Sequence, residues 1–252
     1  MIPGWAGFRS SLLPLQYGLR RHVGDDVMRA DIGSGLGCIR CSAERAAREI
    51  ERALRTSGEP RVDVIGHSLG GLVATYLLKR IDRGERIRSV ITLGTPHRGS
   101  PVARLVASAL ARLSSSIAQM IPESELVQEL AALDVPDRCQ LVSIAADDDA
   151  LVPTLYAELP TRPRQFNLRV PSGGHLGLLF SSEVHAAIRR TLEPARLARI
   201  CAEPLRLVPS AARSGAVGMS HGARRVGGAG SRGNDAARRS PRVAEPALGL
   251  RV

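Results

Sequence analysis

Apolar and polar residues follow one another in blocks along most of the chain, and the blocks switch between two periods. Short apolar runs predict buried strands over 27–32, 62–65, 87–93, 139–146 and 166–170. Apolar residues spaced by three and four predict helices over 42–55, 70–81, 102–113, 124–133 and 182–192, the first of them ending at Gly58. Strands that alternate with helices pair in parallel and carry helices on both sheet faces, so the sequence predicts an α/β fold.

The first residues depart from this pattern. The segment Ile2-Pro3-Gly4-Trp5 has the features of a strand end that turns into a glycine-rich loop, and only Met1 and Ile2 would belong to the strand. A buried parallel strand normally has about five residues. We therefore expect the chain to begin inside an element, through a truncation or a misplaced start codon.

The last residues depart from it as well. From residue 195 on, large apolar residues are too few to offset the entropy of ordering, which predicts an α/β domain over 1–194 and a disordered tail over 195–252. The alternative is a short amphipathic helix around Leu197, Ile200 and Leu205, followed by a tail.

The net charge of +11 belongs mainly to this tail. Residues 195–252 hold eleven arginines against three acidic residues, so the tail carries +8 and the rest of the chain +3. Lys79 is the one lysine among 35 basic residues, a bias that GC-rich coding explains. The tail has no aromatic residues between its arginines, so we expect a solvated segment and no specific nucleic-acid partner.

The sequence shows no clear targeting signal. No apolar run of about 18 residues occurs, so no transmembrane helix is expected. The start lacks a secretory pattern, which predicts a cytoplasmic protein as written, whereas an upstream start would leave room for export.

Cys38 and Cys41 form a C-x-x-C pair, but Cys139 and Cys201 do not complete a zinc site. We interpret the pair as two incidental thiols, with a redox pair as the alternative.

The strongest chemical signal is Gly66-His67-Ser68-Leu69-Gly70-Gly71, which contains the pattern G-x-S-x-G. It follows the predicted strand 62–65 and opens the predicted helix 70–81, and this context makes the match more specific. A serine in so sharp a turn has a strained backbone, and only glycine leaves space two residues to either side. The hydroxyl then stands clear of the sheet at a helix N-terminus, so Ser68 is the predicted nucleophile.

A serine nucleophile needs a histidine base, and the base needs an orienting carboxylate. In such a sheet the chain order is serine, acid, histidine, each on a loop after a strand. Only His175 fits this order; the other histidines lie too early, on helices, beside the serine or in the tail: His22, His67, His97, His185 and His221. After strand 139–146 stand Asp147, Asp148 and Asp149. We favour Asp149, because apolar residues follow it and would hold it inward, with Asp148 as the alternative.

The tetrahedral intermediate of acyl transfer needs two backbone N–H donors. Leu69, the residue after the nucleophile, is expected to supply one. The second is expected from the loop after the first strand, where Trp5 is the candidate.

Four segments resemble those of the α/β-hydrolase superfamily, and within it those of bacterial lipases and esterases. Residues 66–71 match the nucleophile elbow, and residues 93–100 are similar to the T-P-H-x-G-S segment of triacylglycerol lipases and of deacylases related to the GPI inositol-deacylases. Residues 149–153 resemble the acid loop, and residues 174–184 the histidine loop of minimal bacterial lipases. The short first strand, the tail and Pro3, which stands where histidine is common, depart from the family pattern.

The resemblance implies an α/β-hydrolase fold and a serine hydrolase that cleaves small-molecule or lipid esters without metal or organic cofactor. Contact with a lipid surface is a further expectation, and the oligomeric state is not predicted. Residues 100–136 lie where the family places a cap, although packing of two sheet-covering helices explains their apolar residues equally well. The alternatives are an acyltransferase or thioesterase with the same triad, an inactive truncated homologue, and an arginine-rich binding protein.

Overall fold

A parallel sheet of four strands lies at the centre of the fold. The computed structural model describes residues 1–23, 27–110, 113–171 and 173–193, so the predicted tail lies outside the described residues. The strands are β1 (Val62–His67), β2 (Ile87–Leu93), β3 (Gln140–Ala146) and β4 (Gln165–Val170), paired in the order β1-β2-β3-β4. Because all pairs are parallel, the carboxyl ends of the strands meet at one edge of the sheet.

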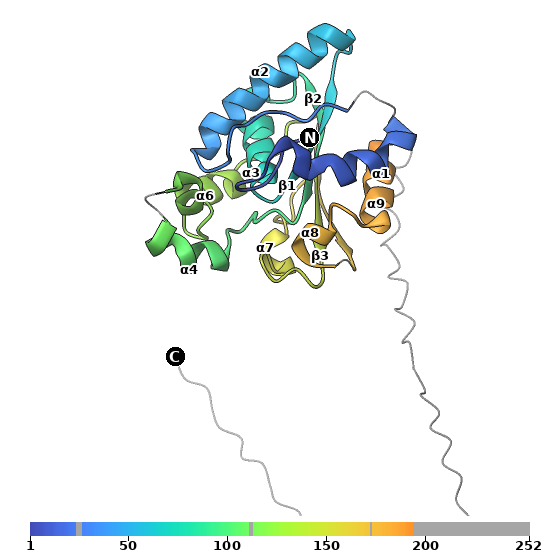
Figure 1. Ribbon diagram of the computed structural model, residues 1–252. Coiled ribbons are helices and arrows are strands. Elements are labelled where there is room, and N and C mark those ends of the chain that lie inside the picture. Colours follow the sequence, from blue (N-terminus) through green and yellow to red (C-terminus); the bar gives the residue numbers. More distant parts are fainter. Residues whose placement is uncertain (24–26, 111–112, 172, 194–252) are drawn as a thin grey trace, which may run out of the picture. The chain divides into compact units, whose positions relative to one another are not determined.

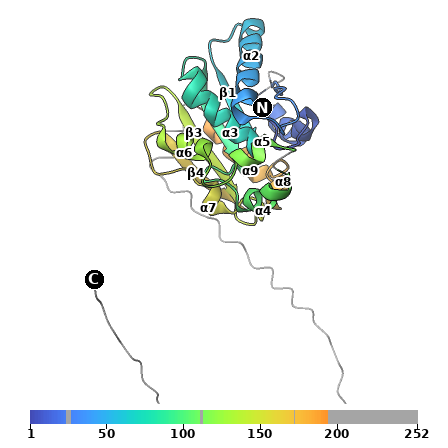
Figure 2. The ribbon, with the colours of Figure 1, turned by 90° about the vertical axis from the view of Figure 1, so that its left-hand side faces the viewer.

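Helices cover both faces of this sheet (Figures 1 and 2). One face packs against α2 (Ile39–Ser57), α3 (Leu69–Tyr76) and its π-helical continuation η2 (Leu77–Asp82). The other face packs against η1 (Arg9–Leu12), α1 (Leu13–Val23) and α9 (Ser182–Leu192). The remaining helices follow the carboxyl ends of β2, β3 and β4: α4 (Pro101–Leu110), α5 (Ser115–Gln119), α6 (Glu125–Ala132), α7 (Thr154–Ala157) and α8 (Gly174–Gly177). The α/β prediction is confirmed.

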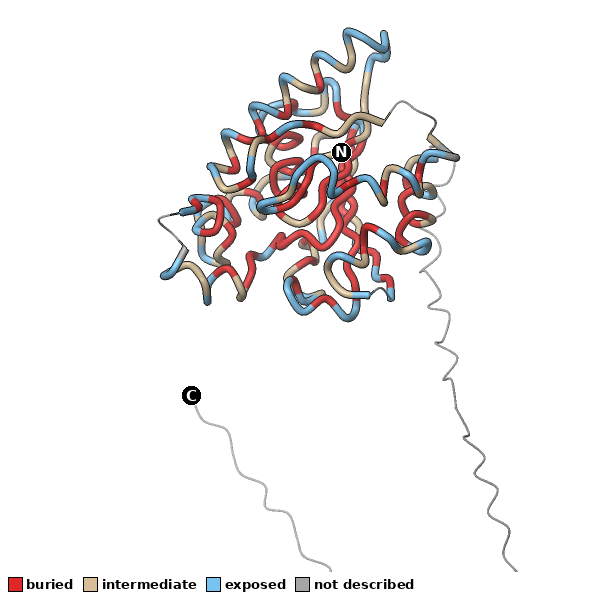
Figure 3. Tube along the Cα trace, viewed as in Figure 1, coloured by how far each residue is buried: buried red, intermediate tan, exposed pale blue. Residues whose placement is uncertain are grey.

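Two hydrophobic cores hold these layers together, one on each face of the sheet. Neighbouring strand residues point to opposite faces, as Val64 and Ile65 do: Val64 joins the α2 and α3 side, Ile65 the α1 and α9 side. Figure 3 shows the buried positions concentrated in the strands and along the inner sides of the helices. The strands that carry the predicted site are thus fixed from both sides.

The five predicted helices differ from the observed ones mainly at their ends. Helix α2 begins at Ile39, with Cys38 as its N-cap, instead of at residue 42. It stops where predicted, because Gly58 takes a left-handed conformation (φ 73°) and donates its N–H to Leu54 O. In the segment 100–136, Ile117 of α5 and Leu126 of α6 belong to the same hydrophobic core as α3.

The predicted strand 27–32 is wrong: these residues form no strand. They lie beside Met1 and Ile2, where Ala30 N–H donates to Met1 O at 2.8 Å. On their other side Met1 and Ile2 reach β1, with Ile2 N–H donating to Ile65 O and His67 N–H donating to Ile2 O. Met1 and Ile2 form a single β-bridge with β1 and no continuous strand. Segment 27–32 therefore has no strand beside it with which it could pair.

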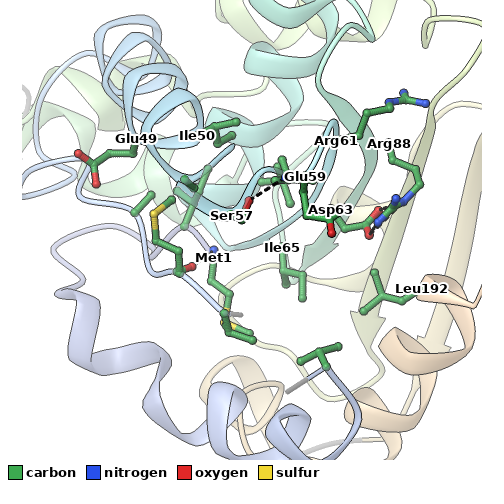
Figure 4. Close-up of a pocket in the computed structure, with 18 of the residues that line it drawn as sticks. Met1, Glu49, Ile50, Ser57, Glu59, Arg61, Asp63, Ile65, Arg88 and Leu192 are labelled. Carbon is green, nitrogen blue, oxygen red and sulfur yellow. Dashed lines mark hydrogen bonds and ion pairs between the residues drawn. The ribbon is translucent and has the colours of Figure 1, made fainter. Parts of the chain in front are cut away.

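A groove of about 1060 Å³ continues from Met1 along the first half of β1 (Figure 4). Ile50 of α2 lines one wall, and Asp63 and Ile65 of β1 line another. The Met1 amino group lies at one end and donates to Met28 O at 2.6 Å. Burial, reinforced by the charge of Arg29, lowers the pKa of this amine from 8.0 to about 5.

Candidate active site

Ser68 occupies the sharp turn between β1 and α3, at the carboxyl edge of the sheet. Its backbone is strained, with φ 54° and ψ −124°, a region that few non-glycine residues adopt. Two hydrogen bonds hold the turn: Ser68 N–H donates to Leu93 O at 2.8 Å, and Thr95 Oγ1 donates to Ser68 O at 2.9 Å. The residue stays partly accessible while its neighbours on both sides are buried.

The glycines around Ser68 are required by close backbone contacts. A methyl group on Gly66 would lie 2.5 Å from Gly70 O, and one on Gly70 would collide with the carbonyls of Ile2 and Pro3. One on Gly71 would collide with the side chain of Thr95. The elbow, the first loop and the end of β2 are therefore packed so closely that only glycine fits among them.

His175 and Asp149 form a bonded pair at the same edge. His175 Nδ1 lies 2.7 Å from Asp149 Oδ2, and Asp149 Oδ1 accepts the N–H groups of Leu151 and Val152 at 2.9 Å each. The Asp149 side chain is fully buried, so its charge depends on these three donors. An ionised carboxylate only accepts, which assigns the proton to His175 Nδ1 and leaves Nε2 as an acceptor.

Gly94 links the pair to the serine. It follows Leu93, whose carbonyl binds the N–H of Ser68. A methyl group on Gly94 would lie 3.1 Å from both Asp149 Oδ2 and His175 Nδ1. The structure therefore brings Ser68, His175 and Asp149 together around the end of β2, although they are far apart in the sequence.

The other two aspartates of the run lie elsewhere. Asp148 is exposed, and its carboxylate accepts the N–H of Gly174 at 3.0 Å, next to His175. Asp147 is exposed as well. Of the three carboxylates, Asp149 is the one that contacts the His175 ring.

His67 takes a position that the sequence did not reveal. Its Nε2 lies 3.1 Å from His175 O, and the two rings are 4.8 Å apart. Burial, followed by the effect of the neighbouring His175, lowers the pKa of His67 to about 4, so its ring is neutral at pH 7. A neutral ring that donates from Nε2 holds the backbone of His175 beside the serine.

The two predicted oxyanion donors lie close to the serine. Leu69 is the first residue of α3, where N–H groups have no acceptor within the helix. Gly4, next to Trp5, packs on the elbow so closely that a methyl group there would lie 3.1 Å from Ser68 Cβ. The Trp5 indole donates to Ser114 Oγ at 3.0 Å, which ties the first loop to the segment before α5.

The remaining described histidine rings have structural surroundings. His97 is buried, with Nε2 2.9 Å from Thr92 Oγ1, and burial, reinforced by Lys79, lowers its pKa to about 3. His185 Nε2 lies 3.1 Å from Leu179 O between α9 and α1. Among the described residues, no three His, Cys, Asp or Glu side chains form a group that could hold a metal ion.

Known proteins share this architecture. A family model described as a PGAP1-like alpha/beta domain matches residues 43–167. The mature Bacillus licheniformis lipase BlEst2 superposes with a TM-score of 0.63 at 16% identity, covering 74% of this chain and 87% of that one. The chain has the α/β-hydrolase fold. Aspergillus fumigatus lipase B superposes with a TM-score of 0.62 at 19% identity, covering 80% of this chain and 55% of that one.

Curated relatives match a shorter stretch of this chain. Triacylglycerol lipases of Pseudarthrobacter phenanthrenivorans and Burkholderia plantarii are each 37% identical over 67 residues, or 27% of the chain. The match spans 20% and 18% of the length of those two lipases. The family model describes an alpha/beta domain, and the two relatives and both superposed structures are lipases. Within the described residues, every helix is too short or too polar to span a bilayer.

Proposed function

We propose that this protein is a hydrolase that cleaves carboxylic esters, with Ser68 as nucleophile, His175 as base and Asp149 as the orienting acid. One observation carries the proposal: a strained serine at a strand–helix turn shares its sheet edge with a bonded histidine–carboxylate pair. Such strain is retained where function requires it. The lipase and esterase relatives support ester hydrolysis over other reactions of this fold.

Acylation would begin when Ser68 Oγ attacks the acyl carbon of the ester. The hydroxyl proton passes to His175 Nε2, and Asp149 stabilises the imidazolium through Nδ1. The backbone N–H groups of Leu69 and Trp5 would hold the oxyanion of the tetrahedral intermediate. The imidazolium then protonates the leaving alcohol, and a water molecule, deprotonated by the same histidine, releases the acid from Ser68.

Exposed apolar side chains favour a lipidic acyl group as the substrate. They come from segments that follow the carboxyl ends of the strands or the bridge at Ile2: Trp5, Phe8, Leu105, Leu113, Leu151, Leu155, Leu176 and Phe180. Phe180 is 65% exposed and Leu176 64%, both close to His175 in the chain. Large apolar side chains that stay exposed indicate a surface that meets an apolar ligand.

The test is hydrolysis of a p-nitrophenyl ester series from acetate to palmitate. Ser68→Ala should lower kcat by about 10³-fold or more, since the nucleophile is lost, while Ser10→Ala, at an exposed serine, should not. Retained hydrolysis by Ser68→Ala would exclude the proposed nucleophile.

The acyl preference is tested separately. Phe180→Ser should lower kcat/KM for long-chain esters more than for acetate, because it removes apolar contact area. The control is Ile81→Thr, at a partly exposed apolar residue in η2, which lies before β2 and thus at the opposite sheet edge. An equal effect of Phe180→Ser on all chain lengths would contradict a lipidic substrate.

A further inference from the structure

Two thiols that ester hydrolysis does not use lie together at the start of α2. Cys38 is the N-cap of this 19-residue helix, and Cys41 is its third residue. Residues three apart at the start of a helix lie on the same side of it, so this spacing places the two thiols next to each other. Cys38 is half-buried and Cys41 exposed, whereas Cys139 is buried. A reagent from solution therefore reaches the pair.

The surroundings make the two thiols chemically unequal. Burial opposes ionisation of Cys38, but the backbone N–H and thiol of Cys41 and the amide of Gln119 outweigh it and lower the pKa of Cys38. The Cys38 sulfur in turn raises the pKa of Cys41. Cys38 is the stronger acid of the two.

Gln119 fixes the pair in place. Its amide nitrogen donates to Cys38 Sγ at 3.6 Å, and its Oε1 accepts the N–H of Ile39 at 2.6 Å. Both contacts come from one side chain on α5, which holds the first turn of α2 and the Cys38 sulfur together. The thiols thus belong to an ordered site between two helices.

We propose that Cys38 and Cys41 form a redox-active dithiol that exchanges with a low-molecular-weight disulfide, R–S–S–R. The Cys38 thiolate attacks one sulfur, releases RS⁻ and forms the mixed disulfide Cys38–S–S–R. Cys41 loses its proton to solvent, attacks the Cys38 sulfur and releases the second RS⁻, which closes the Cys38–Cys41 disulfide. The two cysteines lose two electrons, and R–S–S–R accepts them and becomes two thiols.

Hydrogen bonds connect this dithiol to the loop that carries Trp5. The carbonyl of Leu36, two residues before Cys38, accepts a hydrogen bond from Ser114 Oγ at 3.0 Å. Ser114 Oγ in turn accepts the N–H of the Trp5 indole at 3.0 Å. Because a new disulfide constrains the segment that ends at Cys38, we expect it to alter the environment of the indole.

Peptide mass spectrometry tests the proposal on the full reduced chain. The chain is equilibrated with mixtures of reduced and oxidised glutathione, quenched with iodoacetamide and digested with trypsin. Cleavage after Arg40 separates residues 30–40 from residues 41–45 unless a disulfide joins them. We expect the linked pair to increase with the oxidised fraction and to vanish with dithiothreitol. Unlinked peptides at every ratio would overturn the proposal.

Single variants test the order of the steps. In Cys41→Ser, glutathione should stay on Cys38 as a mixed disulfide, because no second thiol displaces it. In Cys38→Ser, Cys41 should form its adduct at least tenfold more slowly than Cys38 does in Cys41→Ser. Cys201→Ser should behave like the unchanged chain. Equal rates for the two thiols would overturn the assignment of Cys38 as the attacking group.

Fluorescence tests the connection to Trp5 without an ester substrate. Trp5 is the one tryptophan of the chain, so its emission reports on this loop. The reduced and oxidised chains should differ in emission, and Ser114→Ala should abolish the difference. Identical spectra of the two forms would exclude the connection. Both readouts are independent of hydrolysis, so a failure here and a failure of the proposed ester hydrolysis are distinguishable.

Discussion

At the scale of single residues, backbone N–H groups determine which aspartate contacts His175. Three aspartates follow β3, and only Asp149 turns inward. The N–H groups of Leu151 and Val152 bind one of its oxygens and leave the other to His175. Apolar residues after an acid run therefore indicate which member is buried.

Asp149→Asn should abolish most of the activity while leaving the fold intact. If the amide oxygen keeps the two backbone donors, the amide nitrogen faces His175 Nδ1 and forces the proton onto Nε2, which can then no longer accept from serine. A loss on the order of 10³–10⁴ in kcat is expected from the wrong tautomer. Ester hydrolysis measures it, and Asp147→Asn, at an exposed carboxylate, should change kcat less than about twofold. Near-normal activity of Asp149→Asn would contradict the assignment.

The sequence predicted the residues of the candidate site better than it predicted the contacts that hold those residues in place. Chain order and loop position single out Ser68 and His175 without a structure. The contact between His67 and the carbonyl of His175 joins residues 108 positions apart, and no local pattern encodes it. The same holds for the link between Trp5 and Ser114. Such contacts depend on how the loops meet in space.

At the scale of elements, the elbow is stabilised by close approach of backbones. Gly70→Ala should destabilise the fold by roughly 1–3 kcal/mol, because its methyl group would collide with the carbonyls of Ile2 and Pro3. In thermal unfolding this corresponds to a Tm lower by about 2–4 °C per kcal/mol. The control Gly37→Ala places a methyl group in open space and should leave Tm nearly unchanged. Equal Tm values for both variants would refute the packing argument.

The prediction of strands and helices succeeded where the composition of the segment itself determines its structure. It failed where the structure depends on a neighbouring segment. Strands β1 to β4 lie within a residue or two of their predicted bounds. The run 27–32 has strand composition, but its neighbour is the two-residue segment Met1–Ile2. Helix α2 begins earlier than predicted because Cys38, a residue with weak capping preference, takes the N-cap position.

The groove beside β1 predicts a stabilising addition. A chain with five extra residues of alternating apolar character ahead of Met1 should pair with β1 and with residues 28–30, and should bury apolar surface in the groove. We expect a Tm at least about 4 °C above that of a chain with five Gly/Ser residues at the same place. If both extensions give the same Tm, the groove does not accept a strand.

At the scale of the whole molecule, three buried bases make the fold sensitive to acid. The pKa values of the Met1 amine, His67 and His97 fall to about 5, 4 and 3, below their ordinary values of 8.0, 6.5 and 6.5. Between the folded and the ordinary pKa, the unfolded chain binds the proton and the folded chain does not. Each base therefore contributes stability that is fully present above its ordinary pKa and is lost as the pH falls through the folded pKa.

The free energy of unfolding should therefore decrease as the pH is lowered from 8 to 5. A decrease of several kcal/mol is expected, and urea denaturation at pH 8, 7, 6 and 5 measures it. Acetylation of the Met1 amine should remove its contribution to this pH dependence. The free energy of unfolding should then change little with pH above 6.5. A stability that is constant or rises toward pH 5 would contradict the burial of these groups.

The alternation of strands and helices was sufficient to predict the class of the whole fold, because parallel pairing leaves few other arrangements.

The central claim concerns the chemistry at the carboxyl edge of the sheet, and a fluorophosphonate probe tests it most directly. The intact chain is labelled, digested and mapped by peptide mass spectrometry, with Ser68→Ala and Asp149→Asn beside it. The account predicts label on Ser68, none in Ser68→Ala and slow labelling in Asp149→Asn. Folded protein that takes no label at Ser68 would contradict the account.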